Sequence, residues 1–212
     1  MKMTELSKEE IKLFKSLNTP KKIQDFINKI PINFEENGDT CYSPRMVLKN
    51  WKCHCMEGAI LAAQILRFYG YPPLLVDLSA SKNDFDHMLA VFKKDGKWGA
   101  ISKTNHSILR YREPVYNSIR ELAMSHFHEY VNDDGKKTLR RYSMPVNLKK
   151  FDKINWMTTE KEVWEIANHM AETKHYDILN KKQIMGLRKA DKIELDAGKI
   201  VEWHSDSMKK NL

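Results

Sequence analysis

The stretch that most constrains the fold runs from residue 51 to residue 70 and reads WKCHCMEGAILAAQILRFYG. It begins with two cysteines around a histidine and continues as an apolar run with few interruptions. Gly70 and the prolines at 72 and 73 end the run, because glycine suits a helix C-terminus and proline cannot continue a helix. A run that is apolar on nearly every face predicts a helix buried inside a domain. It is too short, and too often interrupted by polar residues, to span a membrane.

The start of this predicted helix is where the sequence points to chemistry. A thiol in the first helical turn is favoured as a thiolate, because the helix dipole and the free backbone N–H groups stabilise negative charge. Cys53 and Cys55 are the two candidates, and either could instead be a buried structural thiol. Structural zinc sites usually take ligand pairs spaced by two or more residues, with a second pair elsewhere. We therefore expect no metal and no cofactor at Cys53-His54-Cys55.

Composition limits the cellular setting. The chain has 212 residues, which predicts one domain with additions or one and a half domains, and its 42% hydrophobic residues are enough for a real core. Its three cysteines are an odd number, and two are separated by a single residue, which argues against a disulfide framework and for a reducing compartment. Residues 1–10 are polar and charged, so no signal peptide is expected. These features predict a cytoplasmic protein without a membrane anchor.

The formal net charge of +8 raises the question of nucleic-acid binding. Lysines are spread along the whole chain and interleaved with acidic residues, and they form no long basic block. That distribution argues against a nucleic-acid partner, which remains a third hypothesis supported by net charge alone.

Residues typical of helix N-termini predict several helices besides the central one. Residues 7–10 have the spacing of a capping box, and Thr19-Pro20 and Ser43-Pro44 each combine an N-cap with a first-turn proline. A further helix is expected after Pro114, carrying Val115 and continuing through residues 119–130. A second capping box at residues 159–162 is expected to start another helix, and residues 181–203 also have helical spacing.

Three apolar segments follow the central helix and predict strands, at residues 73–78, 87–92 and 98–102. Lys94-Asp95-Gly96-Lys97 between the last two is typical of a hairpin turn. One more strand is expected within residues 138–146. A buried helix followed by an antiparallel meander predicts the α+β class. The expected organisation is an N-terminal helical segment (1–42), a core (43–150) and a C-terminal helical extension packed on the core (151–212).

A cysteine nucleophile needs a base to hold it as a thiolate, and a further group to orient that base. His87 opens a predicted strand directly after a polar loop, where its side chain can reach a cleft. The next strand ends in Ser102-Lys103-Thr104-Asn105, so either Ser102 or Asn105 can accept a hydrogen bond from the imidazole. His106 is a rival base near the same strand end.

In this order the residues resemble the transglutaminase-like branch of the papain-like cysteine enzymes. In that family a catalytic Cys caps a buried helix, with a small residue four positions on, an Arg twelve on, a Gly fifteen on and a Pro two later. Cys55, Ala59, Arg67, Gly70 and Pro72 occupy these positions here. Only this register fits, so it assigns the nucleophile to Cys55 and makes Cys53 its neighbour in the turn.

The resemblance extends over about residues 43–105. The family's catalytic His begins a strand, as His87 does, and its third catalytic residue stands four positions after a Trp. Trp98 matches that Trp, but its fourth follower is Ser102, where the family usually has Asp. Serine accepts a hydrogen bond without carrying a charge, and Asn105 is the alternative, because papain-like relatives use Asn in this role.

The resemblance implies a papain- or transglutaminase-like core and acyl transfer through a thioester on Cys55. The substrate would be a peptide, a protein or a small amide. The Cys55 backbone N–H would hold the oxyanion, with Trp51 or His54 as the side-chain donor. Glu57 and Asp86 flank the expected site and would either bind a substrate amine or be solvated. The alternative is an inactive member of the same fold that binds a peptide or protein, which the serine at position 102 favours.

Overall fold

The computed structural model describes residues 6–205. These residues form an α+β fold around one antiparallel sheet of seven strands, in the order β4-β3-β2-β1-β5-β7, with β6 pairing β1. The strands are β1 (Leu74–Ala80), β2 (His87–Lys94), β3 (Lys97–Ser102), β4 (Arg112–Tyr116), β5 (Leu139–Ser143), β6 (Val146–Asn147) and β7 (His175–Asp177).

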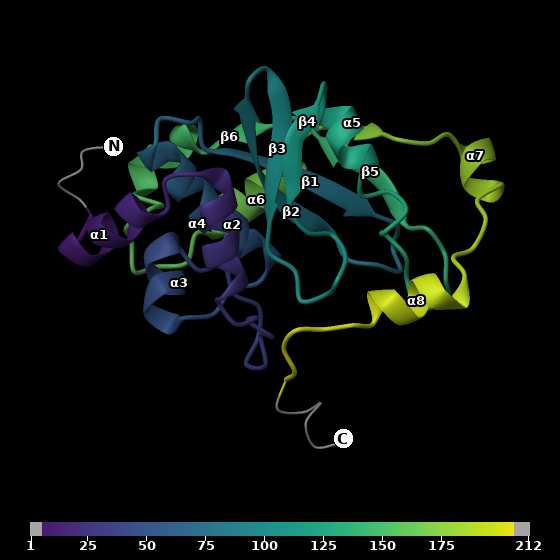
Figure 1. The fold of residues 1–212 in the computed structure, drawn as a ribbon, viewed down its shortest axis with the longest axis horizontal. Coiled ribbons are helices and arrows are strands. Elements are labelled where there is room, and N and C mark those ends of the chain that lie inside the picture. The colour runs from purple at the N-terminus through teal and green to yellow at the C-terminus, as the bar shows by residue number, and fades with distance from the viewer. Residues whose placement is uncertain (1–5, 206–212) are drawn as a thin grey trace.

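Helices cover both faces of this sheet. They are α1 (Lys8–Ser16), α2 (Pro20–Asn28), α3 (Pro44–Asn50), α4 (Cys55–Phe68), α5 (Ile119–Met124), the 3₁₀ helix η2 (Leu148–Ile154), α6 (Trp164–Glu172), α7 (Lys181–Met185) and α8 (Lys192–Gly198). Figure 1 shows α1 to α4 gathered on one side of the molecule, with α7 and α8 at the opposite end.

Alternation along the strands divides the core into two clusters. Met88, Ala90 and Phe92 of β2 pack with residues of α1 to α4, η2 and α6. Leu89 and Val91, which point the other way, pack with residues of α5 and β5. Successive strand residues point to opposite faces, so β2 is buried on both sides and anchors the site at a central strand.

The central helix α4 is as buried as its sequence predicts. Every residue from 57 to 66 is buried. Fully burying a leucine or isoleucine side chain contributes about 1.5–3 kcal/mol each, so this helix holds its N-terminus firmly against the sheet. It ends at Phe68, and Gly70 then takes a φ of 85°, a left-handed conformation that glycine adopts without a steric penalty.

Several local predictions are confirmed. Ser7 and Glu10 form the capping box of α1, and the side chains of Thr19 and Ser43 cap α2 and α3. The hairpin between β2 and β3 turns through Asp95 and Gly96, which both have positive φ.

The helix predicted to start after Pro114 is wrong in its first part. Pro114 and Val115 belong to β4, an edge strand, and edge strands tolerate a proline because the missing N–H faces away from the sheet. The helix, α5, begins only at Ile119 and is capped by Ser118.

The predicted capping box at residues 159–162 is also wrong. The helix that follows, α6, begins at Trp164 without a side-chain cap. Glu162 instead accepts hydrogen bonds from the Cys41 N–H (3.4 Å) and the Trp164 indole N–H (2.7 Å). The Glu162 carboxylate, which the local pattern assigned to a helix cap, is therefore used in tertiary contacts.

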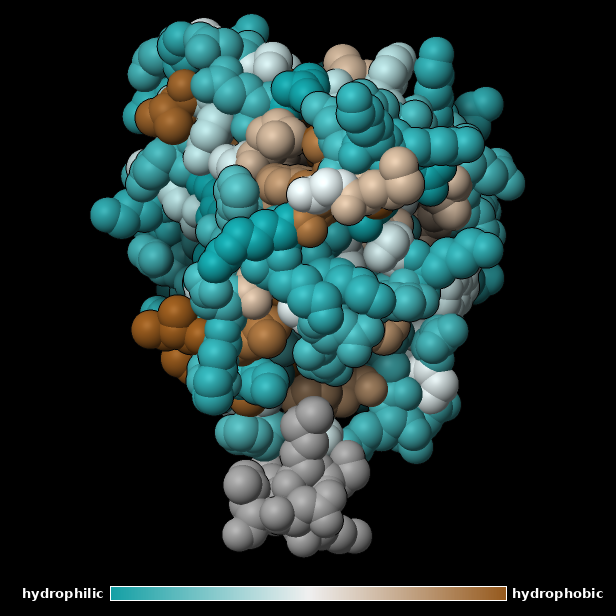
Figure 2. All heavy atoms as spheres, turned by 90° about the vertical axis from the view of Figure 1, so that its right-hand side faces the viewer, coloured by the Kyte–Doolittle hydropathy of each residue, from teal (hydrophilic) through white to brown (hydrophobic). Residues whose placement is uncertain are grey.

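The C-terminal part of the described chain forms two short helices, α7 and α8. Three exposed apolar side chains lie here: Met185 in α7, Ile193 in α8 and Ile200 just after α8. Figure 2 views the molecule from the α7 side and shows apolar groups separated by a hydrophilic surface. The ends of the expected N- and C-terminal segments, residues 1–5 and 206–212, lie outside the described residues. Among residues 6–205, no helix combines the length and apolar character needed to cross a membrane.

Candidate active site

The three residues that the sequence groups as a catalytic set each lie at the end of an element. Cys55 is the first residue of α4, His87 the first of β2 and Ser102 the last of β3. Because β2 and β3 are antiparallel neighbours, the start of one and the end of the other lie at the same edge of the sheet. His87 lies close enough to Cys55 to stabilise its thiolate and lower the pKa of Cys55, and His87 Nε2 lies 2.7 Å from Ser102 Oγ. The structure therefore brings all three together.

The hydrogen bonds of Ser102 decide which tautomer His87 adopts. The Ser102 hydroxyl donates to the backbone oxygen of Leu109 at 2.5 Å. With its single proton used there, Ser102 Oγ accepts from His87, so Nε2 carries a hydrogen and Nδ1 is left to face the sulfur. Gln24 of α2 holds the Ser102 backbone, accepting from its N–H at 2.9 Å and donating to its C=O at 2.8 Å.

The surroundings of Cys55 favour the thiolate. Burial alone would raise the pKa of the Cys55 thiol, but hydrogen bonds from His54 and His87 and their charges outweigh burial and lower this pKa to about 5. A position at the first turn of α4 acts in the same direction, through unpaired N–H groups at the helix N-terminus. Cys41 and Cys53 differ: burial, assisted by the charge of Glu57, raises the pKa of each to about 12. Of the three thiols, Cys55 is the one whose pKa is lowered.

His54, the residue before Cys55, is the N-cap of α4. Its Nε2 lies 3.0 Å from the backbone oxygen of Thr40, and its Nδ1 lies 3.3 Å from the Met56 N–H. Burial works against protonation of His54, but the hydrogen bond to Cys55 and the charge of Glu57 raise the pKa of His54 to about 9. The neutral ring accepts the Met56 N–H at Nδ1, whereas the protonated ring donates from that nitrogen. Cys55 thus has a second imidazole beside it.

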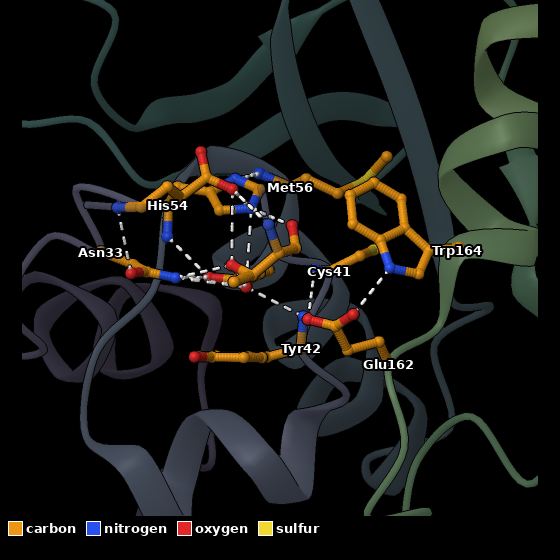
Figure 3. A network of polar contacts seen from close by, with 10 residues as sticks. Asn33, Cys41, Tyr42, His54, Met56, Glu162 and Trp164 are labelled. Atoms are coloured by element: carbon orange, nitrogen blue, oxygen red, sulfur yellow. Dashed lines mark hydrogen bonds and ion pairs between the residues drawn. The ribbon is translucent and has the colours of Figure 1, made fainter. Parts of the chain in front are cut away.

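A buried carboxylate, Glu57, organises the loop in front of α4. Figure 3 shows this network of polar contacts, with Asn33, Tyr42 and His54 labelled. It accepts hydrogen bonds from the Thr40 hydroxyl at 2.8 Å, the Tyr42 N–H at 2.9 Å and the His54 N–H at 3.0 Å. The Asn33 amide also donates to it, at 3.3 Å. The expectation that Glu57 binds a substrate amine or is solvated is therefore wrong, because the side chain is fully buried and its oxygens are occupied by the protein.

Two other candidates lie outside the contacts among Cys55, His87 and Ser102. Asn105 uses its side chain to hold the C-terminal segment, accepting from the Trp203 N–H at 2.8 Å and donating to the Trp203 oxygen at 2.9 Å. Ser102, and not Asn105, is the residue in contact with His87. Trp51 is the left-handed C-cap of α3, about half exposed, with its ring edge-on to Phe26.

His106 and Asp86 have other partners. His106 Nδ1 lies 2.8 Å from the Gly198 oxygen, so this rival base serves to hold the end of α8. Asp86 accepts a hydrogen bond from the Ala80 N–H at 2.8 Å and closes the loop between β1 and β2. That loop ends at His87, and the bond fixes where β2 begins.

Sequence reasoning missed a buried acid–base pair near the site. Asp77 Oδ2 on β1 lies 2.7 Å from His175 Nε2 on β7, and both side chains are buried. Burial raises the pKa of Asp77 to about 6 against the opposing effect of His175, and the charges of Asp86 and Cys55 add to the rise. Asp77 is therefore within electrostatic range of the thiolate. An acidic residue inside the apolar run LLVDLS was the available signal, but nothing in the sequence pointed to His175 as its partner.

No group of three or more His, Cys, Asp or Glu side chains within residues 6–205 is placed to hold a metal ion. No protein-family model matches the sequence, and no curated protein matches it either.

Proposed function

We propose that this protein is a cysteine-dependent acyl-transfer enzyme with a transglutaminase-like, papain-related core. One observation carries the proposal: a thiol at the N-terminus of a buried helix contacts a histidine that is itself oriented by Ser102. A nucleophile, a base in contact with it and a group that orients the base form the arrangement that nucleophilic catalysis requires. The order of these residues along the chain supports the family resemblance drawn from the sequence.

In this mechanism the Cys55 thiolate attacks the carbonyl carbon of an amide or ester and forms a tetrahedral intermediate. His87, as the imidazolium, gives its Nδ1 proton to the leaving amine or alcohol as the C–N or C–O bond breaks, which leaves a thioester on Cys55. Water or an amine then attacks the thioester, His87 Nδ1 takes its proton, and the sulfur leaves as a thiolate. Ser102 keeps the other ring nitrogen protonated throughout.

The oxyanion would be held by the Cys55 backbone N–H, which stands at the first position of α4 and has no acceptor within the helix. Of the two side chains proposed as a second donor, His54 has Nε2 beside the Thr40 oxygen, and its Nδ1 accepts the Met56 N–H when neutral and donates to Cys55 when protonated. Trp51 lies outside the contacts among Cys55, His87 and Ser102, with its ring against Phe26, so the proposal relies on the Cys55 N–H as the donor.

A second function has one observation in its favour. Ser102 carries no charge, so it stabilises imidazolium less than the Asp usual in the family, which favours an inactive fold that binds a peptide or protein. The two functions differ in whether Cys55 forms a covalent acyl intermediate.

The test is acylation by p-nitrophenyl acetate, followed by nitrophenolate release and by peptide mapping of the acetylated residue. The proposal expects a burst of nitrophenolate and acetylation at Cys55, lost in Cys55→Ala and strongly slowed in His87→Ala. Cys41 and Cys53 are internal controls, because their raised pKa keeps them as thiols. Acetylation spread over all three cysteines, or no covalent adduct at Cys55, would overturn the enzyme proposal and leave the binding function.

A further inference from the structure

A serine that orients a catalytic histidine has a problem that an aspartate lacks. A carboxylate only accepts hydrogen bonds, whereas a hydroxyl both donates and accepts. If the Ser102 hydroxyl donated to His87 Nε2, the ring hydrogen would move to Nδ1, and the nitrogen facing Cys55 would no longer be a base. Something must therefore hold the Ser102 proton away from His87.

Leu109 supplies that acceptor from a left-handed backbone conformation. Its φ is 58°, and its backbone oxygen accepts the Ser102 hydroxyl at 2.5 Å. A leucine rarely adopts positive φ, and such residues persist where the surroundings hold them and often occur at functional sites. The conformation of Leu109 thus needs a second contact to maintain it.

Glu129 provides this second contact. Its Oε2 accepts the Leu109 N–H at 2.8 Å, while its Oε1 pairs with Arg112 Nη2 at 2.7 Å. Arg112 is in turn fixed by the Ser125 hydroxyl at 3.0 Å and the Ser125 backbone oxygen at 3.1 Å. The carboxylate that holds Leu109 is therefore itself held in place, although it lies two hydrogen-bonded residues away from His87.

We infer that Glu129 is a positioning residue for the catalytic histidine, acting through Leu109 and Ser102. Glu129 keeps Leu109 in the left-handed conformation, the Leu109 oxygen takes the Ser102 proton, and Ser102 then accepts from His87 Nε2. The chain of contacts replaces the acceptor-only property of an aspartate and selects the tautomer with a free Nδ1. The catalytic role of Glu129 rests on the proposed function. Its effect on the tautomer of His87 does not, and can be tested separately.

The direct test is ¹⁵N NMR of His87 in the full chain carrying Cys55→Ala, under alkaline conditions that leave the ring neutral. The expected result is the Nε2–H tautomer, changing to a mixture or to Nδ1–H when Glu129→Ala is added. Glu129→Gln should preserve the tautomer, because its amide oxygen still accepts the Leu109 N–H. Ser125→Ala is the matched control: it weakens the hold on Arg112 without touching Leu109, and should leave the tautomer unchanged.

In the chain that retains Cys55, Glu129→Ala should slow acylation by about tenfold, below the 10²–10⁴ contributed by general acid–base catalysis as a whole. Glu129→Gln should restore the rate to within about threefold, and circular dichroism checks that each variant is folded. If Glu129→Ala does not fold, Glu129→Asp replaces it, since the shorter side chain withdraws the carboxylate from Leu109.

An unchanged His87 tautomer in a folded Glu129→Ala or Glu129→Asp chain would overturn the inference, even if Cys55 is readily acylated. Conversely, a tautomer that follows Glu129 in a chain never acylated at Cys55 would refute the proposed function and leave the positioning role intact.

Discussion

Glu57 and His54 fix each other across the first turn of α4. The His54 N–H donates to Glu57 Oε2 at 3.0 Å, and His54 Nε2 lies 3.5 Å from Glu57 Oε1. Because His54 immediately precedes Cys55, this buried carboxylate controls the position of the helix N-terminus at which the thiolate forms. Its charge is also one of the causes that raise the pKa of His54, against the effect of burial.

Replacing Glu57 tests how far the site depends on this carboxylate. Glu57→Ala leaves the Tyr42 and His54 N–H groups without an acceptor, and leaves the Thr40 hydroxyl with only its longer bond to Glu35 (3.4 Å), so we expect a loss of about 3 kcal/mol or more in the free energy of unfolding. Glu57→Gln retains one carbonyl oxygen and should lose less, about 1–2 kcal/mol. Urea denaturation measures both. An alanine variant that unfolds at the same urea concentration as the unaltered protein would contradict this role.

Replacing Ser102 and replacing Asn105 by alanine should have different effects, one on the rate of acylation and the other on stability. Ser102→Ala removes the acceptor of His87 Nε2, so we expect acylation of Cys55 to slow by about tenfold or more. Asn105→Ala should leave acylation unchanged and release the segment around Trp203, with a loss of about 1–2 kcal/mol from two hydrogen bonds. Nitrophenolate release and urea denaturation measure the two effects. Slower acylation in Asn105→Ala than in Ser102→Ala would transfer the orienting role to Asn105.

The difference between these two residues shows where sequence reasoning stopped. Spacing from Trp98 pointed to Ser102 and chemical type pointed to Asn105, and both stand at the predicted strand end. The deciding facts are a 2.7 Å contact to His87 for one and a pairing with Trp203, distant in sequence, for the other. A partner 98 residues away leaves no local pattern.

The elements were more predictable than the contacts between them. The length of α4 and the β2–β3 hairpin follow from local signals: an apolar run, a glycine with positive φ and a turn sequence. Pro114 and Val115 lie in the edge strand β4 because that segment pairs with β3, a neighbour that the local sequence does not reveal. Glu57, Glu129 and His175 make tertiary contacts near the candidate site that spacing could not reveal.

Gly58 offers a test of packing beside the site. A Cβ added to Gly58 would lie 2.6 Å from Lys103 Cβ and 3.5 Å from Cys53 Sγ. The close atom is next to the backbone and cannot swing away, so Gly58→Ala should cost about 1–3 kcal/mol of stability. Gly198→Ala in α8 is the matched control, because its Cβ would meet nothing closer than 3.6 Å. The control should be neutral or slightly stabilising by thermal unfolding, and an equally neutral Gly58→Ala would refute the packing.

Stability should depend on pH through Cys55 and His54 together. The pKa of Cys55 falls from 9.0 to about 5 on folding, so its contribution is complete above pH 9 and is lost as the pH falls through 5. The pKa of His54 rises from 6.5 to about 9, so its contribution is complete below pH 6.5 and is lost as the pH rises through 9. Between pH 6.5 and 9 the two slopes cancel, and between 5 and 6.5 only Cys55 acts.

The stability advantage of the unaltered protein over Cys55→Ala should therefore increase by about 2 kcal/mol from pH 5 to pH 6.5. Urea denaturation of both chains across this range measures the difference. A difference that stays constant, or that falls as the pH rises, would show that Cys55 is protonated in the folded protein at these pH values.

The central claim is that Cys55 is a thiolate held by His54 and His87, and the pH dependence of its alkylation by iodoacetamide tests it most directly. Alkylation at each cysteine is followed by peptide mapping from pH 4 to pH 10. The account predicts a midpoint near pH 5 for Cys55, moved upward in His87→Ala, with Cys41 and Cys53 unreactive below pH 9. A Cys55 midpoint near 9, or a profile that His87→Ala leaves unchanged, would contradict it.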